Sequence, residues 1–177
     1  MSKSQTASTV EPLDAADQYL TFMLGNEEFG VEILRVQGIQ GWDSATPIPN
    51  SPDYVLGVTN LRGSIVPIID LRRRFELAEQ DFGPTTVVIV VRVESPNQDR
   101  TVGMVVDGVS EVYSVNPEEV QPAPQFGGNV DTLFVKGLAT IDERMLILLD
   151  IDRLLHDSIE AVTEADVVED PDDGASE

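Results

Sequence analysis

The sequence contains no cysteine and only one histidine among its 177 residues. Without cysteine the chain can form no disulfide, no thiolate metal site and no thiol nucleophile. A single imidazole, His156, is also too few for a multi-histidine metal site, and its place at the start of an acidic stretch favours an ordinary surface histidine over a member of a catalytic triad. We therefore expect no catalytic residue, no bound metal and no cofactor.

Basic residues are scarce as well: 11 lysines and arginines face 32 acidic residues, which gives a net charge of -21. Nucleic-acid binding needs clustered basic side chains, so nucleic acid is excluded as a partner. The glycine patterns of dinucleotide-binding folds and of P-loops are missing too. Residues 170–174 resemble a calcium loop, but the chain ends before a closing Glu. A carboxylate-based enzyme is left as a remote alternative.

No apolar run is long enough to cross a membrane. The longest strongly apolar stretch is Thr85–Val91, and residues 1–17 lack the apolar core of a signal peptide. We expect a cytoplasmic protein that does not insert directly into a membrane.

The acidic charge is concentrated at the C-terminal end. Residues 157–177 hold nine acidic side chains and no basic one, and residues 1–17 are polar with few large apolar side chains. Such segments cannot bury enough apolar surface to offset the entropy of ordering. We expect a disordered N-terminal tail over 1–17, a folded body over 18–156 and a disordered acidic tail over 157–177, for which a solubilising role is the simplest interpretation.

The body has the pattern of short strands. Residues 19–24 and 29–33 alternate in polarity around a turn, and a second hairpin is expected from Thr85–Val93 and Thr101–Val106. The best helical candidate is Asp150–His156, where Asp150 can cap a short helix. Pro67 predicts that its strand is an edge strand or carries a bulge, because proline has no N–H for a sheet ladder.

A weak internal repeat indicates two similar halves. Each half reads as a hairpin, a glycine-led apolar segment and a final apolar run that ends in Asp. The matching positions at one offset are Gly30, Ile33, Val36 and Ile39 with Gly103, Val106, Val109 and Val112; those at a second offset are Gly57, Leu61, Ile65, Ile68, Ile69, Asp70 and Leu71 with Gly137, Ile141, Met145, Leu148, Leu149, Asp150 and Ile151. Short strands punctuated by Gly and Pro favour an all-β fold of two small barrels side by side.

The remaining candidates are surface residues. Gly63 is expected to adopt a positive φ in a turn that presents Arg62 either to a partner or to an internal carboxylate; both interpretations stay open. The basic cluster Arg72–Arg74 is interpreted as a solvated strand end. Val36, Ile39, Val109 and Val112 are either core residues or the lining of an apolar groove that accepts a partner helix; the repeat places them in equivalent segments.

Five motifs, in the order in which they occur along the chain, resemble those of a known family. They are Gln18–Gln37, Gly57–Gly63, Val66–Leu71, Val105–Val112 and Pro122–Phe126, and the resemblance over about residues 18–155 is to the CheW family of chemotaxis coupling proteins. It implies two intertwined five-stranded β-barrel subdomains of the Src-homology-3 type with one or two short helices. It also implies a non-enzymatic adaptor between methyl-accepting chemoreceptors and the regulatory domain of the histidine kinase CheA. Such an adaptor would be recruited to receptor arrays at the inner membrane, with other copies of the same protein as further partners.

The resemblance also assigns residues to two surfaces. Its receptor-binding groove would include Val36, Ile39, Gly57, Arg62, Val109 and Val112, and its kinase-binding surface would include Phe126 and Gln121. Gly38 and Gln121 depart from residues common in the family, a Glu and a basic residue respectively, which puts the choice of partner in question. A CheW-like scaffold in another receptor–kinase pathway, such as surface or pilus motility, stays open as an alternative.

Overall fold

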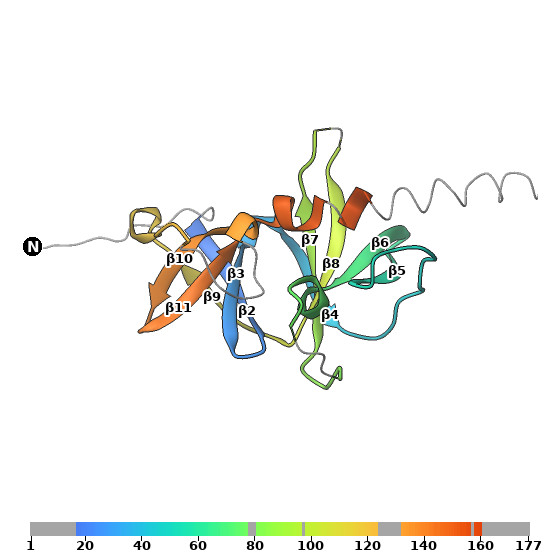
Figure 1. Ribbon diagram of the computed structural model, residues 1–177, viewed down its shortest axis with the longest axis horizontal. Coiled ribbons are helices and arrows are strands. Elements are labelled where there is room, and N and C mark those ends of the chain that lie inside the picture. The colour runs from blue at the N-terminus through green and yellow to red at the C-terminus, as the bar shows by residue number, and fades with distance from the viewer. Residues whose placement is uncertain (1–16, 78–80, 97, 124–131, 157, 161–177) are drawn as a thin grey trace, which may run out of the picture.

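A computed structural model describes residues 17–77, 81–96, 98–123, 132–156 and 158–160 of the chain. The chain forms two five-stranded sheets that lie next to each other, joined by short helices (Figure 1). Nearly all of the expected tails, residues 1–16 and 161–177, lies outside the described residues.

Each sheet contains two hairpins and one additional strand. The first sheet has the order β10-β11-β3-β2-β9, and the second has the order β4-β7-β8-β6-β5. The strands of the first sheet are β2 (Gln18–Leu24), β3 (Glu27–Glu32), β9 (Gly108–Ser114), β10 (Val135–Ile141) and β11 (Arg144–Leu149). Those of the second sheet are β4 (Val36–Gly41), β5 (Val55–Leu61), β6 (Ser64–Asp70), β7 (Val87–Val93) and β8 (Arg100–Val106).

Short helices connect the strands. The 3-10 helices are η2 (Ile33–Arg35), η3 (Pro117–Glu119) and η4 (Thr132–Phe134), and α1 (Leu71–Arg74) follows β6. A helical segment of residues 151–156 and 158–160 follows β11 and runs towards the second sheet (Figure 1). It contains the predicted helix, and Asp150 caps it by accepting a hydrogen bond from the Arg153 N–H at 3.2 Å.

Each half of the chain places its first hairpin in one sheet and its other three strands in the other sheet. β4 follows β3 through η2 but pairs with β7 of the other sheet, and β9 follows β8 but pairs with β2. Each sheet is therefore built from both halves of the chain. This topology confirms the predicted pair of intertwined five-stranded units.

The repeat has a physical counterpart in the parallel strand pairs. Gly30 of β3 pairs with Leu148 of β11, and Gly103 of β8 pairs with Ile68 of β6, at equivalent positions of the two halves. A Cβ at Gly103 would lie 2.8 Å from Ile68 Cδ1, and one at Gly30 would lie 3.2 Å from Leu148 Cδ2. Glycine recurs because these strand pairs leave little space for a side chain.

A single large core joins the two sheets. It contains Leu20 and Phe22 of the first sheet together with Val91 and Met104 of the second. The buried Phe29 ring stacks on Phe22 and on Phe75, with centroid separations of 5.9 and 5.6 Å. Because residues of both sheets share this core, the subdomains form one packed body.

The structure corrects one of the two alternatives expected for Pro67, the edge strand; an irregularity does occur in the pairing of β5 with β6, between Val55 and Gly57. The strand of Pro67, β6, lies between β5 and β8, so it is not an edge strand. Val58, opposite Pro67, exchanges both of its backbone hydrogen bonds with Thr46 on its other side, at 2.9 and 2.8 Å. The parallel pairing with β8 starts only at Ile68. An N–H at position 67 is therefore not needed, and proline is tolerated inside the sheet.

The interpretation of Arg72–Arg74 as a solvated strand end is wrong. These residues form α1, which begins where Asp70 accepts a hydrogen bond from the Arg72 N–H at 3.0 Å. The Arg72 guanidinium binds Asp107 through two hydrogen bonds of 2.8 and 2.6 Å, and only 11% of the Arg72 side chain is exposed. Arg74 lies over the rings of Tyr54 and Phe134.

The folded body continues past the expected boundary at His156. Ser158 is buried, and Ile159 packs against the main core. The helical segment therefore belongs to the packed body as far as Glu160.

Candidate protein-binding surfaces

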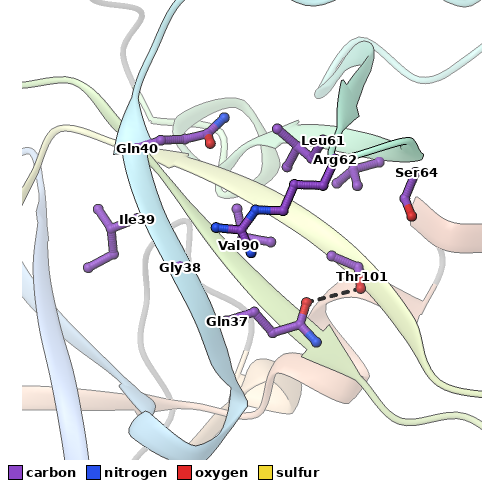
Figure 2. Close-up of a pocket in the computed structure, with 10 residues that line it drawn as sticks. Gln37, Gly38, Ile39, Gln40, Leu61, Arg62, Ser64, Val90 and Thr101 are labelled. Atoms are coloured by element: carbon purple, nitrogen blue, oxygen red, sulfur yellow. Dashed lines mark hydrogen bonds between the residues drawn. The ribbon is translucent and has the colours of Figure 1, made fainter.

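Arg62 lies at a cleft between the two edge strands of the second sheet. The cleft has a volume of about 280 Å³ and is bordered by β4 on one side and by the β5–β6 hairpin on the other. Its lining consists of Gln37, Gly38, Ile39, Gln40, Leu61, Arg62, Ser64, Val66, Val90 and Thr101. We call it the Arg62 cleft. In Figure 2 the Arg62 side chain extends towards β4 across Val90.

The backbone at Arg62 is held in a tight turn. Arg62 has φ 55° and Gly63 has φ 87°, so both central residues of the hairpin are left-handed, and the predicted positive φ of Gly63 is confirmed. The Gly63 N–H donates to Asn60 Oδ1 at 2.9 Å. The side chain of Arg62 is exposed and forms no ion pair with any described residue. Of the two interpretations left open for Arg62, the internal ion pair has no support among the described carboxylates.

The four apolar groove candidates divide into two kinds. Val36 and Val109 are half-buried and pack against the main core. Ile39 and Val112, which the repeat makes equivalent, are 46% and 47% exposed on β4 and β9. Figure 2 shows the Ile39 side chain projecting from β4 on the side away from Arg62. Both Ile39 and Arg62 border the Arg62 cleft, although the Ile39 side chain points away from Arg62, and the other four predicted residues do not line it.

Gly57 has a structural reason to be glycine. Its φ is 141°, and a Cβ there would lie 2.1 Å from the Thr46 backbone oxygen. Gly57 is buried and offers no side chain to a partner. Its contribution to a groove is indirect: it lets the segment before β5 pair with Val58 beside the Arg62 hairpin.

The kinase-facing candidates lie on the first sheet or outside the described residues. Gln121 is exposed, and its backbone exchanges hydrogen bonds of 2.9 and 2.8 Å with Leu138. Gln121 also borders a shallow cavity of about 340 Å³ with Glu119, Leu138, Thr140 and Met145. Phe126 lies outside the described residues.

The chain passes from one sheet to the other at two links, between β3 and β4 and between β8 and β9. A largely buried arginine–aspartate ion pair stabilises each link. Arg35 of η2 binds Asp152 through two hydrogen bonds of 2.8 Å and also donates to the Arg92 backbone oxygen. These hydrogen bonds hold the pKa of the Asp152 carboxyl below its usual range, although burial acts in the opposite direction. Arg35 therefore ties η2, the link from β3 to β4, to the C-terminal helical segment and to β7 of the second sheet.

Asp107 occupies the corresponding link between β8 and β9. Burial favours the neutral form of its carboxyl, but the hydrogen bonds from Arg72 and from the Gly25 N–H outweigh burial and keep the pKa of Asp107 lowered. The two crossover links are therefore each held by an arginine–aspartate pair whose members come from different parts of the chain.

The titratable groups of the described residues do not gather into a recognisable catalytic or metal site. His156 is more than half exposed and pairs with Glu160 at 3.2 Å, which confirms the surface interpretation. No group of three or more metal-ligating side chains gathers among the described residues. None of the helices in the described part of the chain is long and apolar enough to cross a membrane.

Sequence reasoning missed three exposed residues near these surfaces. Arg100 borders a second groove beside the Arg62 cleft, and Ile65 and Met145 are 60% and 48% exposed. The sequence did contain a signal for the exposure of Ile65 and Met145. The repeat makes the two residues equivalent, and each precedes a residue that is buried. Two equivalent outward apolar positions on β6 and β11 follow from strand alternation.

Comparisons with known proteins agree with the fold. A family model described as a CheW-like domain matches residues 18–158. The chain is 48% identical over 150 residues to Chemotaxis protein CheW of Klebsiella aerogenes, an alignment that covers 85% of this chain and 88% of that protein. It is 27% identical over 141 residues to Protein FrzA of Myxococcus xanthus, with 78% of this chain and 85% of that protein covered.

A solved structure has the same architecture. The crystal structure of the scaffolding protein TtCheW from Thermoanaerobacter tengcongensis matches with a TM-score of 0.73 at 29% sequence identity. The match covers 85% of this chain and 94% of the solved chain. The similarity therefore extends over both sheets and is not limited to one hairpin.

Proposed function

This chain belongs to the CheW-like domain family, and from that premise we propose that it joins the cytoplasmic tip of a methyl-accepting chemoreceptor to the regulatory domain of the histidine kinase CheA. The protein is a non-enzymatic chemotaxis adaptor of scaffold type. In this role it would be recruited from the cytoplasm to receptor arrays, where other copies of the chain are further neighbours. The observation that carries the proposal is the match of the family over the whole folded body, residues 18–158.

We assign the receptor-binding site to the second sheet, at β4 and the β5–β6 hairpin. Support comes from Arg62, which is exposed and forms no ion pair with the described residues, and from the exposed Ile39 on the neighbouring edge strand. A few exposed anchors of this kind, one apolar and one an arginine, can carry much of the energy of a protein interface. A helical receptor tip would bring apolar side chains to Ile39 and a carboxylate to Arg62.

The kinase is assigned to the first sheet around Gln121. The cavity bordered by Gln121 and Met145 and the exposure of the Met145 side chain support this assignment. A receptor on one sheet and a kinase on the other would be held in fixed relation, because the sheets share one core. A small shift of the receptor could then bias a conformational equilibrium of the kinase without any chemistry by the adaptor.

The test uses two surface variants and one matched control. Ile39→Asp and Arg62→Ala should each weaken binding of a receptor cytoplasmic fragment by roughly tenfold or more, as expected for interface anchors. Arg153→Ala removes another exposed arginine, whose side chain is 67% exposed, and should leave the affinity unchanged. Val36→Asp is a poorer probe, because Val36 packs against the core and its replacement would also destabilise the fold.

Thermal unfolding separates a binding defect from a folding defect. Arg62 forms no ion pair with described residues, and Ala would occupy the same left-handed turn position as Arg, so Arg62→Ala should leave the melting temperature nearly unchanged. If folded Ile39→Asp and Arg62→Ala variants bind the receptor fragment as tightly as the native chain, the assignment of the receptor site is wrong.

A further inference from the structure

Two exposed arginines stand out because they have no acidic partner among the residues that the structure describes. The other arginines and the lysine of the described residues lie in ion pairs or, in the case of Arg74, against aromatic rings. Arg62 and Arg100 have neither kind of contact with a described residue. An unpaired arginine in a chain with a net charge of -21 is a site where an acidic segment gains a favourable interaction.

Arg62 and Arg100 border two adjoining grooves on the second sheet. Arg62 lines the cleft next to β4, and Arg100 lines a second groove of about 250 Å³. Ser64, Val66 and Thr101 line both. The two grooves therefore form one continuous strip, which we call the arginine strip.

The last described residues of the C-terminal helical segment lie at this strip. Ile159 lines the groove of Arg100, and the described chain ends one residue later at Glu160. Residues 161–177 follow, with seven acidic side chains and no basic one. A segment of this length can extend over about 55 Å when fully stretched, and a flexible chain of the same length has a mean end-to-end distance of about 20–25 Å. The neighbouring Arg62 cleft is within reach.

We propose that residues 161–177 bind back across the arginine strip, with their carboxylates against Arg62 and Arg100, and so compete with the receptor for the Arg62 cleft. The competition rests on the receptor assignment proposed above, whereas the intramolecular contact does not. Charge complementarity and the position of Ile159 in the strip, two residues before the segment, identify this segment as the occupant.

The contact should be partial and sensitive to salt. Exposed ion pairs are individually weak and are screened within about 8 Å at physiological ionic strength. Tethering compensates, since a short linker gives an effective concentration in the millimolar range. If the segment occupied the strip about 80% of the time, the receptor would bind about fivefold more weakly than to an open strip.

The contact can be measured without any receptor. The chain has no cysteine, so Ser176→Cys in the full chain provides a single attachment point for a nitroxide spin label. We expect the label to broaden the amide NMR signals of Ser64 and Thr101 but not that of Thr140 on the first sheet. The broadening should disappear at about 0.5 M salt, where screening is short-ranged. Absence of broadening at low salt, or equal broadening of Thr140, would overturn the proposal.

Two arginine variants of the labelled chain show where the segment binds. Arg62→Ala combined with Arg100→Ala should abolish the broadening. Arg153→Ala, which removes an exposed arginine outside the strip, should leave it unchanged. Equal broadening in both variants would mean that the segment does not recognise the arginine strip.

Receptor binding tests the competition itself. In the full chain, the seven acidic residues are replaced by their amides as E164Q, D166N, E169Q, D170N, D172N, D173N and E177Q. This variant should bind a receptor cytoplasmic fragment about fivefold more tightly than the native chain at low salt. Equal affinities would overturn the competition. Failure of both chains to bind, with the spin-label contact present, would instead reject the receptor assignment and leave the intramolecular contact standing.

Discussion

At the scale of single residues, Gly57 is the position where backbone geometry leaves least choice. Gly57→Ala should destabilise the protein by roughly 3 kcal/mol or more, because it combines a left-handed backbone with a Cβ 2.1 Å from the Thr46 oxygen. Urea unfolding measures the loss. Gly41→Ala is the control: no atom lies within 4 Å of a Cβ there, and the change should be within about 0.5 kcal/mol. Similar losses for both variants would contradict this explanation.

Asp152 predicts a pH dependence of stability. Its pKa is lower in the folded protein than in the unfolded chain, so the ionised carboxyl stabilises the fold. The contribution is present in full above the unfolded pKa of about 4 and is lost as the pH falls through the folded value. Asp152→Asn should cost about 1–3 kcal/mol at pH 7, since it removes charge-assisted hydrogen bonds to Arg35.

Urea unfolding of Asp152→Asn and of the native chain from pH 7 to about pH 2 measures this dependence. The difference in stability should shrink as the pH falls below about 4, where the native Asp152 becomes protonated. Asp43→Asn changes an exposed carboxyl that has no ion pair with any described residue, and should have little effect at any pH. A difference for Asp152→Asn that stays constant from pH 7 to pH 2 would show that the charge of Asp152 is not the cause.

Residues in local turns could be predicted from sequence, and residues held by distant partners could not. The turn at Arg62 and Gly63 was readable because a short pattern between two strands determines it. The burial of Arg72 depends on Asp107, which lies 35 positions further along the chain. No local pattern identifies that partner, so an arginine cluster beside glutamates has the same appearance as a solvated strand end.

At the scale of elements, the parallel pairing of β6 with β8 depends on Gly103. A Cβ at Gly103 would lie 2.8 Å from both Ile68 Cδ1 and Val88 Cγ1, so Gly103→Ala should cost about 1–3 kcal/mol of stability. Gly30→Ala, at the equivalent position of the first sheet, should cost less, because its nearest contact would be 3.2 Å. Urea unfolding of the two variants provides the comparison.

A double variant tests whether crowding is the reason. Ile68→Val removes Cδ1, so the loss in Gly103→Ala combined with Ile68→Val should be smaller than the sum of the two single losses. Additive losses would mean that Gly103 is required for another reason.

The hairpins could be predicted from polarity alternation, but the passage of the chain to the other sheet at β4 and at β9 could not be derived from it. Alternation indicates that a strand exists and which face is buried, not which strand lies beside it. The intertwined arrangement of the two subdomains was predicted only from the family resemblance. Pro67 shows the same limit: the rule about missing N–H groups is sound, but the pairing of Val58 with Thr46 makes that N–H unnecessary.

At the scale of the whole molecule, the two crossover links and the shared core make one packed body with several faces. Arg62 and Ile39 lie on the second sheet, and Gln121 and Met145 lie on the first. A body of this kind can hold two partners in fixed relation. The unequal distribution of charge belongs to this scale too. Seven carboxylates follow Glu160, and the neighbouring Ile159 lines the groove of Arg100, one of two arginines that have no ion pair with a described residue.

The most direct test of the central claim is co-sedimentation of CheA with receptor-containing membranes. CheA should sediment with the membranes when this chain is present, and much less when it is absent. Arg62→Ala should reduce both the sedimented chain and the sedimented CheA, whereas Arg153→Ala should behave as the native chain. If CheA sediments equally with and without the chain, or if the chain binds neither the receptor membranes nor CheA, the protein does not couple receptor to kinase.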